Sequence, residues 1–233
     1  MQIQFGAAKV PKQNVGESGD TLEIIERPRG GLSAVLVDGQ RSGRNAKIIS
    51  NIVARKAVSL LGEGVRDGAV GRAAHDYLVT HRSGQVSAEL VIVSVDLNTR
   101  TLVVSRNTHC PAYVWRDDAL EVLASDSLPI GIRDLTKPSI VELPIEVGTY
   151  VVAFTDGLTP LEQAQGEASL EAILRRCVAD HLGAQAVADL LLRAALALEH
   201  GRPGDDVSVL VLATFDEPVP DGARRLTVSF AVP

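Results

Sequence analysis

The sequence predicts an α+β protein in which helices cover the outer faces of antiparallel sheets. Two pairs of amphipathic helical segments are separated by a long run of β-branched segments. Short polar turns, rather than helices, join those central segments, which favours hairpins over a parallel sheet. Hydrophobic residues make up 45% of the 233 residues. That is enough for one substantial core, and the length suits one large domain or two small ones; of these we expect a single domain over residues 1–233.

The first helical pair is expected after the stretch VLVDGQRSG. Apolar residues recur every three or four positions over residues 43–61, which places them on one face of a helix. Ser42 is a candidate N-cap and Gly62 a candidate stop. A second helix is expected from Asp67, as its cap, to about residue 82, where a Ser-Gly pair ends it.

The middle of the chain is typical of β-hairpins. Residues 86–96 and 101–107 are joined by a short polar turn, and residues 112–124 form a second hairpin that turns at Asp117 and Asp118. Further strands are expected at residues 139–145, 149–156 and 207–215, helices at 169–181 and 184–200, and an edge strand at 225–232. A Rossmann-like fold is the alternative, but it needs G-x-G-x-x-G, and Gly39-Gln40-Arg41-Ser42-Gly43 lacks that spacing.

Composition excludes several classes of function. The net charge is −6 and only 3% of residues are aromatic, so we expect no nucleic-acid binding. The longest apolar stretch is interrupted by Arg193 and is too short to span a bilayer, and the N-terminus does not resemble a signal peptide. Cys110 and Cys177 lack the spacing of a zinc site or a disulfide framework. We therefore expect a cytoplasmic protein with free thiols and no membrane contact.

Aspartates recur where apolar strands begin or end. They are Asp20 at one strand entrance, Asp38 and Asp156 at strand exits and followed by glycine, and Asp205 and Asp206 at the entrance to the last core strand. Antiparallel neighbours can bring such positions to one edge, where several carboxylates would repel each other. Mg²⁺ and Mn²⁺ require this kind of hard oxygen ligand. The alternative for each aspartate is an ordinary turn or strand-end residue.

In this order and spacing, the stretches resemble the PPM-type (protein phosphatase 2C-like) serine/threonine phosphatases, in the bacterial branch of SpoIIE and RsbX. The resemblance runs from about residue 18 to residue 215. It rests on Ser18-Gly19-Asp20, Asp38-Gly39 followed by Ser42-Gly43, Pro111, Leu128-Pro129-Ile130-Gly131-Ile132, Thr155-Asp156-Gly157-Leu158 and Gly204-Asp205-Asp206-Val207-Ser208.

The resemblance implies a four-layer α-β-β-α sandwich with two divalent cations, Mn²⁺ or Mg²⁺. Asp38 would bridge both ions, the Gly39 carbonyl would hold one of them, and Asp20 would hold that same ion directly or through water. Asp156 and Asp205 would hold the other, with Asp206 as second choice. Two such ions generate hydroxide near neutral pH, which would attack phosphoserine or phosphothreonine in line. By resemblance, the expected substrate is a phosphorylated STAS-type anti-anti-sigma factor or stressosome component.

Two departures from the family pattern leave alternatives open. Arg41 stands where a glycine is expected, so it needs another turn or carries backbone strain, and its guanidinium either contacts substrate phosphate or points to solvent. His109 lies in a segment without the usual glycine, as a core or surface residue or as a proton donor. The first helix pair either only covers the sheet or transmits partner binding to Asp38. The rival functions are a pseudophosphatase that only docks partners and a hydrolase of small phosphate esters or nucleotides.

Overall fold

The computed structural model describes residues 1–28, 30–132, 135–219 and 221–230. One sheet contains β1 (Gln2–Val10), β6 (Ala112–Arg116), β7 (Ala119–Leu123), β9 (Tyr150–Phe154) and β10 (Val207–Phe215). The other contains β2 (Thr21–Arg27), β3 (Gly31–Gly39), β4 (Ala88–Asp96), β5 (Thr101–Asn107) and β8 (Ser139–Pro144). The helices are α1 (Gly43–Gly62), α2 (Asp67–Arg82), α3 (Thr159–Glu162), α4 (Leu170–Ala179) and α5 (Ala184–Leu198), with short 3₁₀ turns η1 (Asp156–Leu158) and η2 (Gly166–Ala168).

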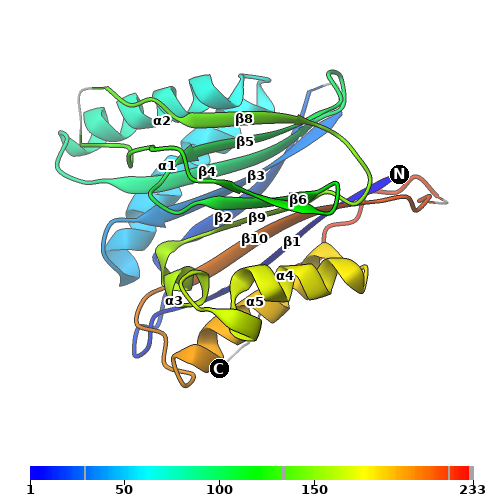
Figure 1. Cartoon of the computed structure of the whole chain (residues 1–233). Helices are drawn as coiled ribbons and strands as arrows, with labels where there is room; N and C mark the ends of the chain where they lie inside the picture. The colour runs from blue at the N-terminus through cyan, green and yellow to red at the C-terminus, as the bar shows by residue number, and fades with distance from the viewer. Residues whose placement is uncertain (29, 133–134, 220, 231–233) are drawn as a thin grey trace.

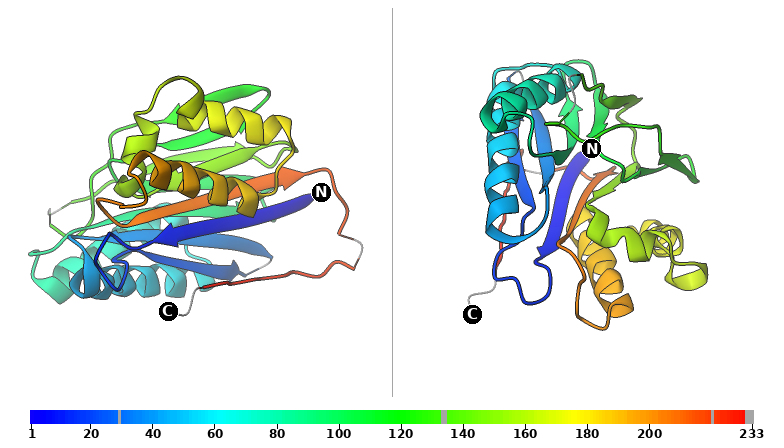
Figure 2. Two further views of the ribbon diagram at one scale, coloured as in Figure 1. Left: turned by 90° about the horizontal axis from the view of Figure 1, so that it is seen from below. Right: turned by 90° about the vertical axis from the view of Figure 1, so that its left-hand side faces the viewer.

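The elements form four layers (Figure 1). Within the described residues the strand orders are β1-β10-β9-β6-β7 and β2-β3-β4-β5-β8, and neighbouring strands within each sheet run antiparallel. The sheets pack face to face, with α1 and α2 outside one sheet and α3, α4 and α5 outside the other (Figures 1 and 2). The predicted α-β-β-α sandwich and both predicted hairpins are therefore confirmed.

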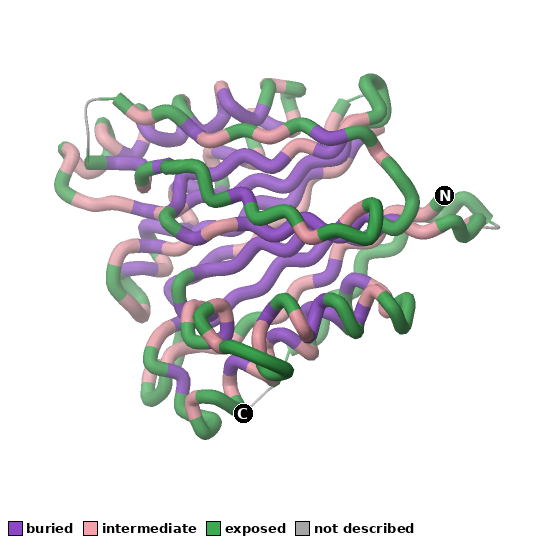
Figure 3. The backbone as a smooth tube through the Cα atoms, viewed as in Figure 1, coloured by how far each residue is buried: buried purple, intermediate pink, exposed green. Residues whose placement is uncertain are grey.

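Apolar side chains fill all three spaces between the layers. Strand β3 shows why its sequence is almost continuously apolar: Leu36 packs between the sheets, whereas Val35 and Val37 pack outward against the first helix pair. A strand that is buried on both faces loses the alternation of a half-exposed one. Figure 3 shows this as buried backbone along the strands of both sheets, with exposed backbone at the turns and outer helix faces.

The helix starts differ from expectation in how they are capped. Ser42 occupies the N-cap of α1, but its side chain makes no capping hydrogen bond. Arg66, rather than Asp67, is the N-cap of α2, so the predicted cap is one residue late. The physical reason is that the Asp67 carboxylate is already occupied, by the Arg27 guanidinium at 2.8 Å and by the Ser94 hydroxyl. Asp67 still lies in the first turn, where negative charge favours the helix dipole.

Strand β1 has no counterpart among the predicted elements. Most of its residues are only partly buried, so its sequence lacks a clear alternation. It forms through long-range pairing instead, from Gln2 opposite Phe215 to Val10 opposite Val207. Gly6 allows α5 to approach this strand, because a Cβ at that position would overlap the backbone of Ala184.

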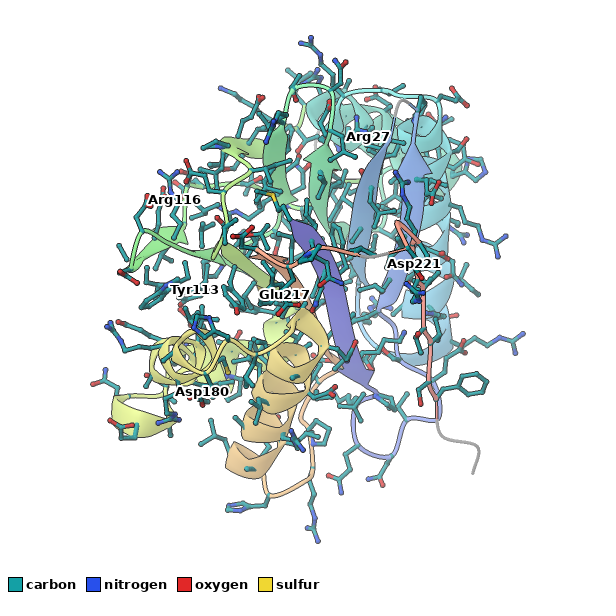
Figure 4. All side chains as sticks on the ribbon, turned by 90° about the vertical axis from the view of Figure 1, so that its right-hand side faces the viewer. Arg27, Tyr113, Arg116, Asp180, Glu217 and Asp221 are labelled. Carbon is teal, nitrogen blue, oxygen red and sulfur yellow. The ribbon has the colours of Figure 1, made fainter. Side chains whose placement is uncertain are left out.

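The predicted edge strand at 225–232 is wrong over residues 225–230, and residues 231–232 lie outside the described ranges. The segment alternates Leu226, Val228 and Phe230 with polar residues, but all three apolar side chains are exposed. An ion pair between Arg224 and Glu26 at 3.3 Å holds its beginning. In Figure 4, the labelled Glu217 and Asp221, which precede this segment in the chain, lie across the end of the sandwich. Alternation alone does not make a strand where no sheet edge pairs with it.

Candidate metal centre

The aspartates that the sequence predicts as metal ligands lie together at one end of the sandwich. Asp20 directly precedes β2, and Asp38 is the penultimate residue of β3. Asp156 begins η1 after β9, and Asp205 lies just before β10. The right-hand view of Figure 2 looks toward this end. Because β9 and β10 are antiparallel neighbours, the exit of one lies beside the entrance of the other, as the strand pattern suggests.

An open pocket of about 190 Å³ lies at this end. Three of the predicted acidic residues line it, together with residues of the loop after β3 and the start of β4. The lining residues are Asp38, Gln40, Arg41, Ser87, Ala88, Glu89, Pro129, Asp156 and Asp205. The pocket is therefore predominantly acidic, with one arginine at its border.

Asp20 is fully buried and links the two sheets. Its Oδ2 accepts hydrogen bonds from the Thr155 hydroxyl at 2.9 Å and from the Ser208 hydroxyl at 2.6 Å. Its Oδ1 has no hydrogen-bond partner among the described residues. Burial raises the pKa of Asp20 to about 7, although the two hydroxyls oppose that shift. A buried carboxylate oxygen without a partner is costly unless a ligand completes it.

The neighbouring acids raise each other's pKa. Burial, followed by the charges of Asp20 and Asp156, raises the pKa of Asp38 to about 9. The pKa of Asp156 is raised as well, first by desolvation and then by the charges of Asp205 and Glu89. Within the described residues, no ion pair includes any of these acids. Lys9 and Lys47 donate to the backbone carbonyl of Asp20, and the Lys9 charge opposes the rise in the pKa of Asp20, but neither lysine pairs with a carboxylate of this group.

This donor set fits a divalent cation. Carboxylates are the oxygen ligands that Mg²⁺ and Mn²⁺ prefer, and a cation would stabilise their charged forms. The orphaned Oδ1 of Asp20 supports the same conclusion. Among the described residues, no group of three acidic, histidine or cysteine side chains is close enough together to hold an ion as it stands. Binding of a cation would therefore require the side chains of the pocket to move toward each other.

The two adjacent aspartates before β10 have different environments. The carboxylate of Asp206 is buried and accepts hydrogen bonds from the backbone N–H groups of Lys12 and Gly19, each at 2.9 Å. It thereby fastens the loop that leads to Asp20. Asp205 is only partly buried and lines the pocket. Of the two, Asp205 is the better candidate for a metal ligand.

The loop after β3 is held in a fixed shape. A Cβ on Gly39 would overlap the carbonyl of Ala46, so glycine is required for α1 to pack this closely. Gln40 exchanges two hydrogen bonds with Ser87, one through its backbone N–H and one through its side-chain Oε1, each at 3.1 Å. Arg41 has a φ of +75°, which a non-glycine residue adopts only with strain. Of the two backbone alternatives for Arg41, the structure shows the strained one.

The other candidates lie differently from the acids. His109 is exposed and does not line the pocket. Cys110 and Cys177 are buried free thiols, and burial raises the pKa of Cys110 to about 12, which keeps it protonated. The pocket therefore offers carboxylates rather than a thiolate or an imidazole.

Inside the described ranges every helix is too short or too polar to cross a lipid bilayer.

Glu89 is an acidic pocket residue that the sequence pattern does not reveal. It lies near the start of β4, directly opposite Asp38 of β3. In the sequence it is one polar residue in the stretch SAELVIV, which is ordinary for a strand. Only the register of β3 against β4 reveals its position, and a pairing of these two strands would have been the signal to look for.

Comparison with known proteins places this geometry in a family. The family model described as Stage II sporulation protein E (SpoIIE) matches residues 28–215. Stage II sporulation protein E of Bacillus subtilis strain 168 is 21% identical over 213 residues, which are 91% of this chain and 26% of that protein. The chain thus spans about a quarter of the length of this relative.

Three solved structures share the fold. The PP2C phosphatase domain of Bacillus subtilis SpoIIE, with a fragment of its regulatory domain, matches with a TM-score of 0.77 and 20% identity, over 91% of this chain and 63% of that one. The RsbU and RsbW domains of a Mycobacterium tuberculosis protein match with a TM-score of 0.72 and 18% identity, over 94% and 61%. The catalytic domain of the serine/threonine phosphatase PstP, in complex with two manganese ions, matches with a TM-score of 0.68 and 16% identity, over 92% and 99%.

At these identities the structural matches show that the chain has the PP2C-type fold. The family match goes further, because it covers most of the chain and includes the stretches that carry Asp38, Asp156 and Asp205. The fold, the convergent acids and the family model agree, and the chain belongs to the Stage II sporulation protein E (SpoIIE) family.

Proposed function

We propose that this protein hydrolyses phosphoserine and phosphothreonine in a protein substrate with the aid of two divalent cations, Mn²⁺ or Mg²⁺. The observation that carries the proposal is the convergence of four aspartates from both sheets on one end of the sandwich, where none of their carboxylates forms an ion pair within the described residues. Membership of the SpoIIE family supports it, as does the similar PstP catalytic domain, which contains two manganese ions.

Each aspartate has a proposed role. Asp38 would contribute to holding both cations; Asp20 and the Gly39 carbonyl would hold one of them, and Asp156 and Asp205 would hold the other. When bound, the cations supply Lewis-acid charge that acidifies water and offsets the charge on phosphoryl oxygens. The Thr155 and Ser208 hydroxyls orient Asp20, so that its Oδ1 is the oxygen left for a ligand.

Arg41 is the proposed contact for the substrate phosphate. Its side chain is exposed and lines the acidic pocket, and within the described ranges it takes part in no ion pair. A guanidinium binds phosphate oxygens in a bidentate manner. The strained backbone at Arg41 is compatible with this role, because strain persists where the surrounding structure fixes a residue for function.

The pocket suits a phosphate that is presented by a protein. Its volume of about 190 Å³ is below the usual range of pockets that enclose a small molecule. It is open to the surface, so a phosphorylated side chain can enter while the rest of the substrate stays outside. The proposed substrate is a phosphorylated STAS-type anti-anti-sigma or stressosome component in the cytoplasm, and the similarity to RsbU and RsbW domains supports a regulatory partner.

We propose residues 1–233 as one domain.

The pseudophosphatase alternative is not favoured. It would explain the strained Arg41 and the altered segment around His109. It would not explain why Asp38, Asp156 and Asp205 still line one pocket while the Asp20 Oδ1 is left without a partner. A docking module has no need for repelling carboxylates, which only cost stability in the absence of a cation.

The test is phosphatase activity of the full chain with Mn²⁺ and with Mg²⁺, on a phosphoserine protein and on p-nitrophenyl phosphate. Asp38→Asn should lower turnover by on the order of 10²–10³, because the Lewis-acid contribution is several kcal/mol. Asp118→Asn is the matched control, since it makes the same change at an exposed hairpin turn. Turnover that needs neither metal, or no turnover by a folded wild-type protein, would refute the proposal.

A further inference from the structure

The carboxylate of Glu89 has no part in the proposed function, although it lines the same pocket. The register of β3 against β4 places Glu89 directly opposite Asp38. Residues in such pairs have Cβ atoms about 4.5–5.5 Å apart, and like charges there are destabilising. A sheet that keeps two acids face to face at its end therefore calls for a physical explanation.

Both carboxylates face the space between the sheets. Along β4, Val91 and Val93 pack into the core between the sheets, and Glu89 continues this alternation on the same face. Along β3, Leu36 packs into that core, and Asp38 continues the alternation. Glu89 thus approaches the proposed cation site from the strand next to the one that carries Asp38.

The position of Glu89 is fixed by hydrogen bonds. The buried Thr108 hydroxyl donates to its Oε2, and the backbone N–H of His109 donates to its Oε1 at 3.4 Å. The Thr108 oxygen in turn accepts from the backbone N–H of Cys110 at 3.0 Å, which fixes the direction of its hydroxyl. Each carboxylate oxygen of Glu89 therefore retains acceptor capacity for a ligand in the pocket.

The charge of Glu89 has no ionic partner among the described residues. It acts on its neighbours instead, and it is one of the charges that raise the pKa of both Asp38 and Asp156. In a cation-free protein this arrangement is unfavourable. In the presence of a divalent cation the same charge becomes attractive, since it adds to the negative potential at the ion.

We propose that Glu89 is a further acidic residue of the metal centre and sets its affinity for divalent cations, with Thr108 as its positioning residue. This inference rests on the proposed function, because the cation concerned is the one that Asp38 holds. It assigns a role to a residue near the start of β4 that is not among the aspartates recognised in the sequence.

The test is Mn²⁺ binding by isothermal titration calorimetry with the full chain. Glu89→Gln keeps the shape but removes the charge, and it should weaken Mn²⁺ binding by about tenfold or more, the range for residues that support metal ligands. Glu89→Asp restores the charge and should recover most of the affinity. Thr108→Val removes the hydroxyl donor and should weaken binding severalfold. Glu142→Gln, an exposed site on β8, is the matched control and should bind as the wild type does.

A second readout separates this role from a purely structural one. In EDTA, Glu89→Gln should unfold at the same temperature as the wild type or higher, because a like-charge pair across β3 and β4 is removed. Equal Mn²⁺ affinity in the wild type and Glu89→Gln, or no recovery in Glu89→Asp, would overturn the inference and leave the proposed function intact. A folded wild-type protein that binds no Mn²⁺ would overturn both.

Discussion

The two ends of the sheet that contains β2, β3 and β4 both carry buried or half-buried charge, but only one end neutralises it. At the end seen in Figure 4, Arg27 forms an ion pair with Asp67 at 2.8 Å, and the side chains are 9% and 7% exposed. The Arg27 guanidinium also donates to the Val65 carbonyl at 3.0 Å. At the opposite end, the carboxylates of Asp20 and Asp38 form no ion pair among the described residues, although Lys9 and Lys47 donate to the Asp20 backbone carbonyl.

This contrast separates charge that stabilises the fold from charge that serves a ligand. A buried pair with satisfied hydrogen bonds holds elements together, here the end of β2 and the first turn of α2. A group of like charges that the fold does not neutralise costs stability, so it persists where a ligand uses it. Family membership indicates what kind of ligand to expect, and the unpaired carboxylates of the pocket are where we propose that this ligand binds.

We expect the largest fall in the free energy of unfolding when the ion pair between Arg27 and Asp67 is removed. Asp67→Ala leaves the Arg27 guanidinium buried without its partner and should cost about 3–5 kcal/mol. For a chain of this size that is a fall in Tm of roughly 10 °C. Urea unfolding followed by circular dichroism measures it. The double variant Arg27→Met/Asp67→Leu should lose less than Asp67→Ala alone, because no unpaired charge is left. A double variant as unstable as the single one would show that the charge is not the cause.

The acidic end should make the stability of the metal-free protein depend on pH. Folding raises the pKa of Asp20 to about 7 and that of Asp38 to about 9, from an ordinary value of 3.8. Between roughly pH 4 and pH 9 the folded protein retains protons that the unfolded chain has released, so its stability falls as the pH rises. We expect a loss of about 1–3 kcal/mol from pH 6 to pH 7, measured by urea unfolding in EDTA, since each acid contributes about 1.4 kcal/mol per pH unit between its two pKa values.

Asp38→Asn provides the control for this pH dependence. It removes one of the titrating acids, so its stability should decline less steeply with pH than that of the wild type. Equal slopes would mean that Asp38 keeps its ordinary pKa in the folded protein. A stability that rises with pH would contradict the whole description of this end as a set of repelling carboxylates.

The strain at Arg41 should have a smaller effect. Arg41→Gly relieves a left-handed backbone that costs about 1–3 kcal/mol, but glycine also gains freedom in the unfolded chain, so we expect a net gain of about 0.5–1 kcal/mol. Arg41→Ala keeps a Cβ at the same φ and should not be stabilised. Both variants lose the guanidinium, so both should raise KM for the phosphoprotein. A normal KM in both would remove Arg41 from the substrate site.

Local patterns predicted the parts of the fold and of the candidate site that depend on short stretches of chain. Aspartates at strand entrances and exits can be recognised because each lies beside an apolar run and next to a turn. The convergence of Asp20 with Thr155 and Ser208 follows once the sheets are antiparallel and packed face to face. The hairpin turn at Asp117 and Asp118 was predicted from the local sequence in the same way. It shows that an acid at a strand end is not always part of a functional site.

The parts that were missed depend on pairing between distant residues. Strand β1 is specified by its partner β10, about two hundred residues away, more than by its own alternation. Glu89 becomes a pocket residue only through the register of β4 against β3. In the opposite direction, Leu226 and Phe230 have a strand-like pattern but no strand to pair with. Local sequence reports what a segment can form, whereas register and partners decide what it does form.

The smallest expected effect tests whether burial is what distinguishes the two ends. Glu171 and Arg175 on α4 form an ion pair at 3.1 Å, close to the distance in the Arg27–Asp67 pair, but their side chains are 55% and 60% exposed. Glu171→Ala should cost no more than about 0.5 kcal/mol, because water and salt screen an exposed pair. Urea unfolding under the conditions used for Asp67→Ala measures it. If Glu171→Ala lowered the free energy of unfolding as much as Asp67→Ala, the proximity of opposite charges alone would explain the stabilisation by the Arg27–Asp67 pair, and burial would not contribute to it.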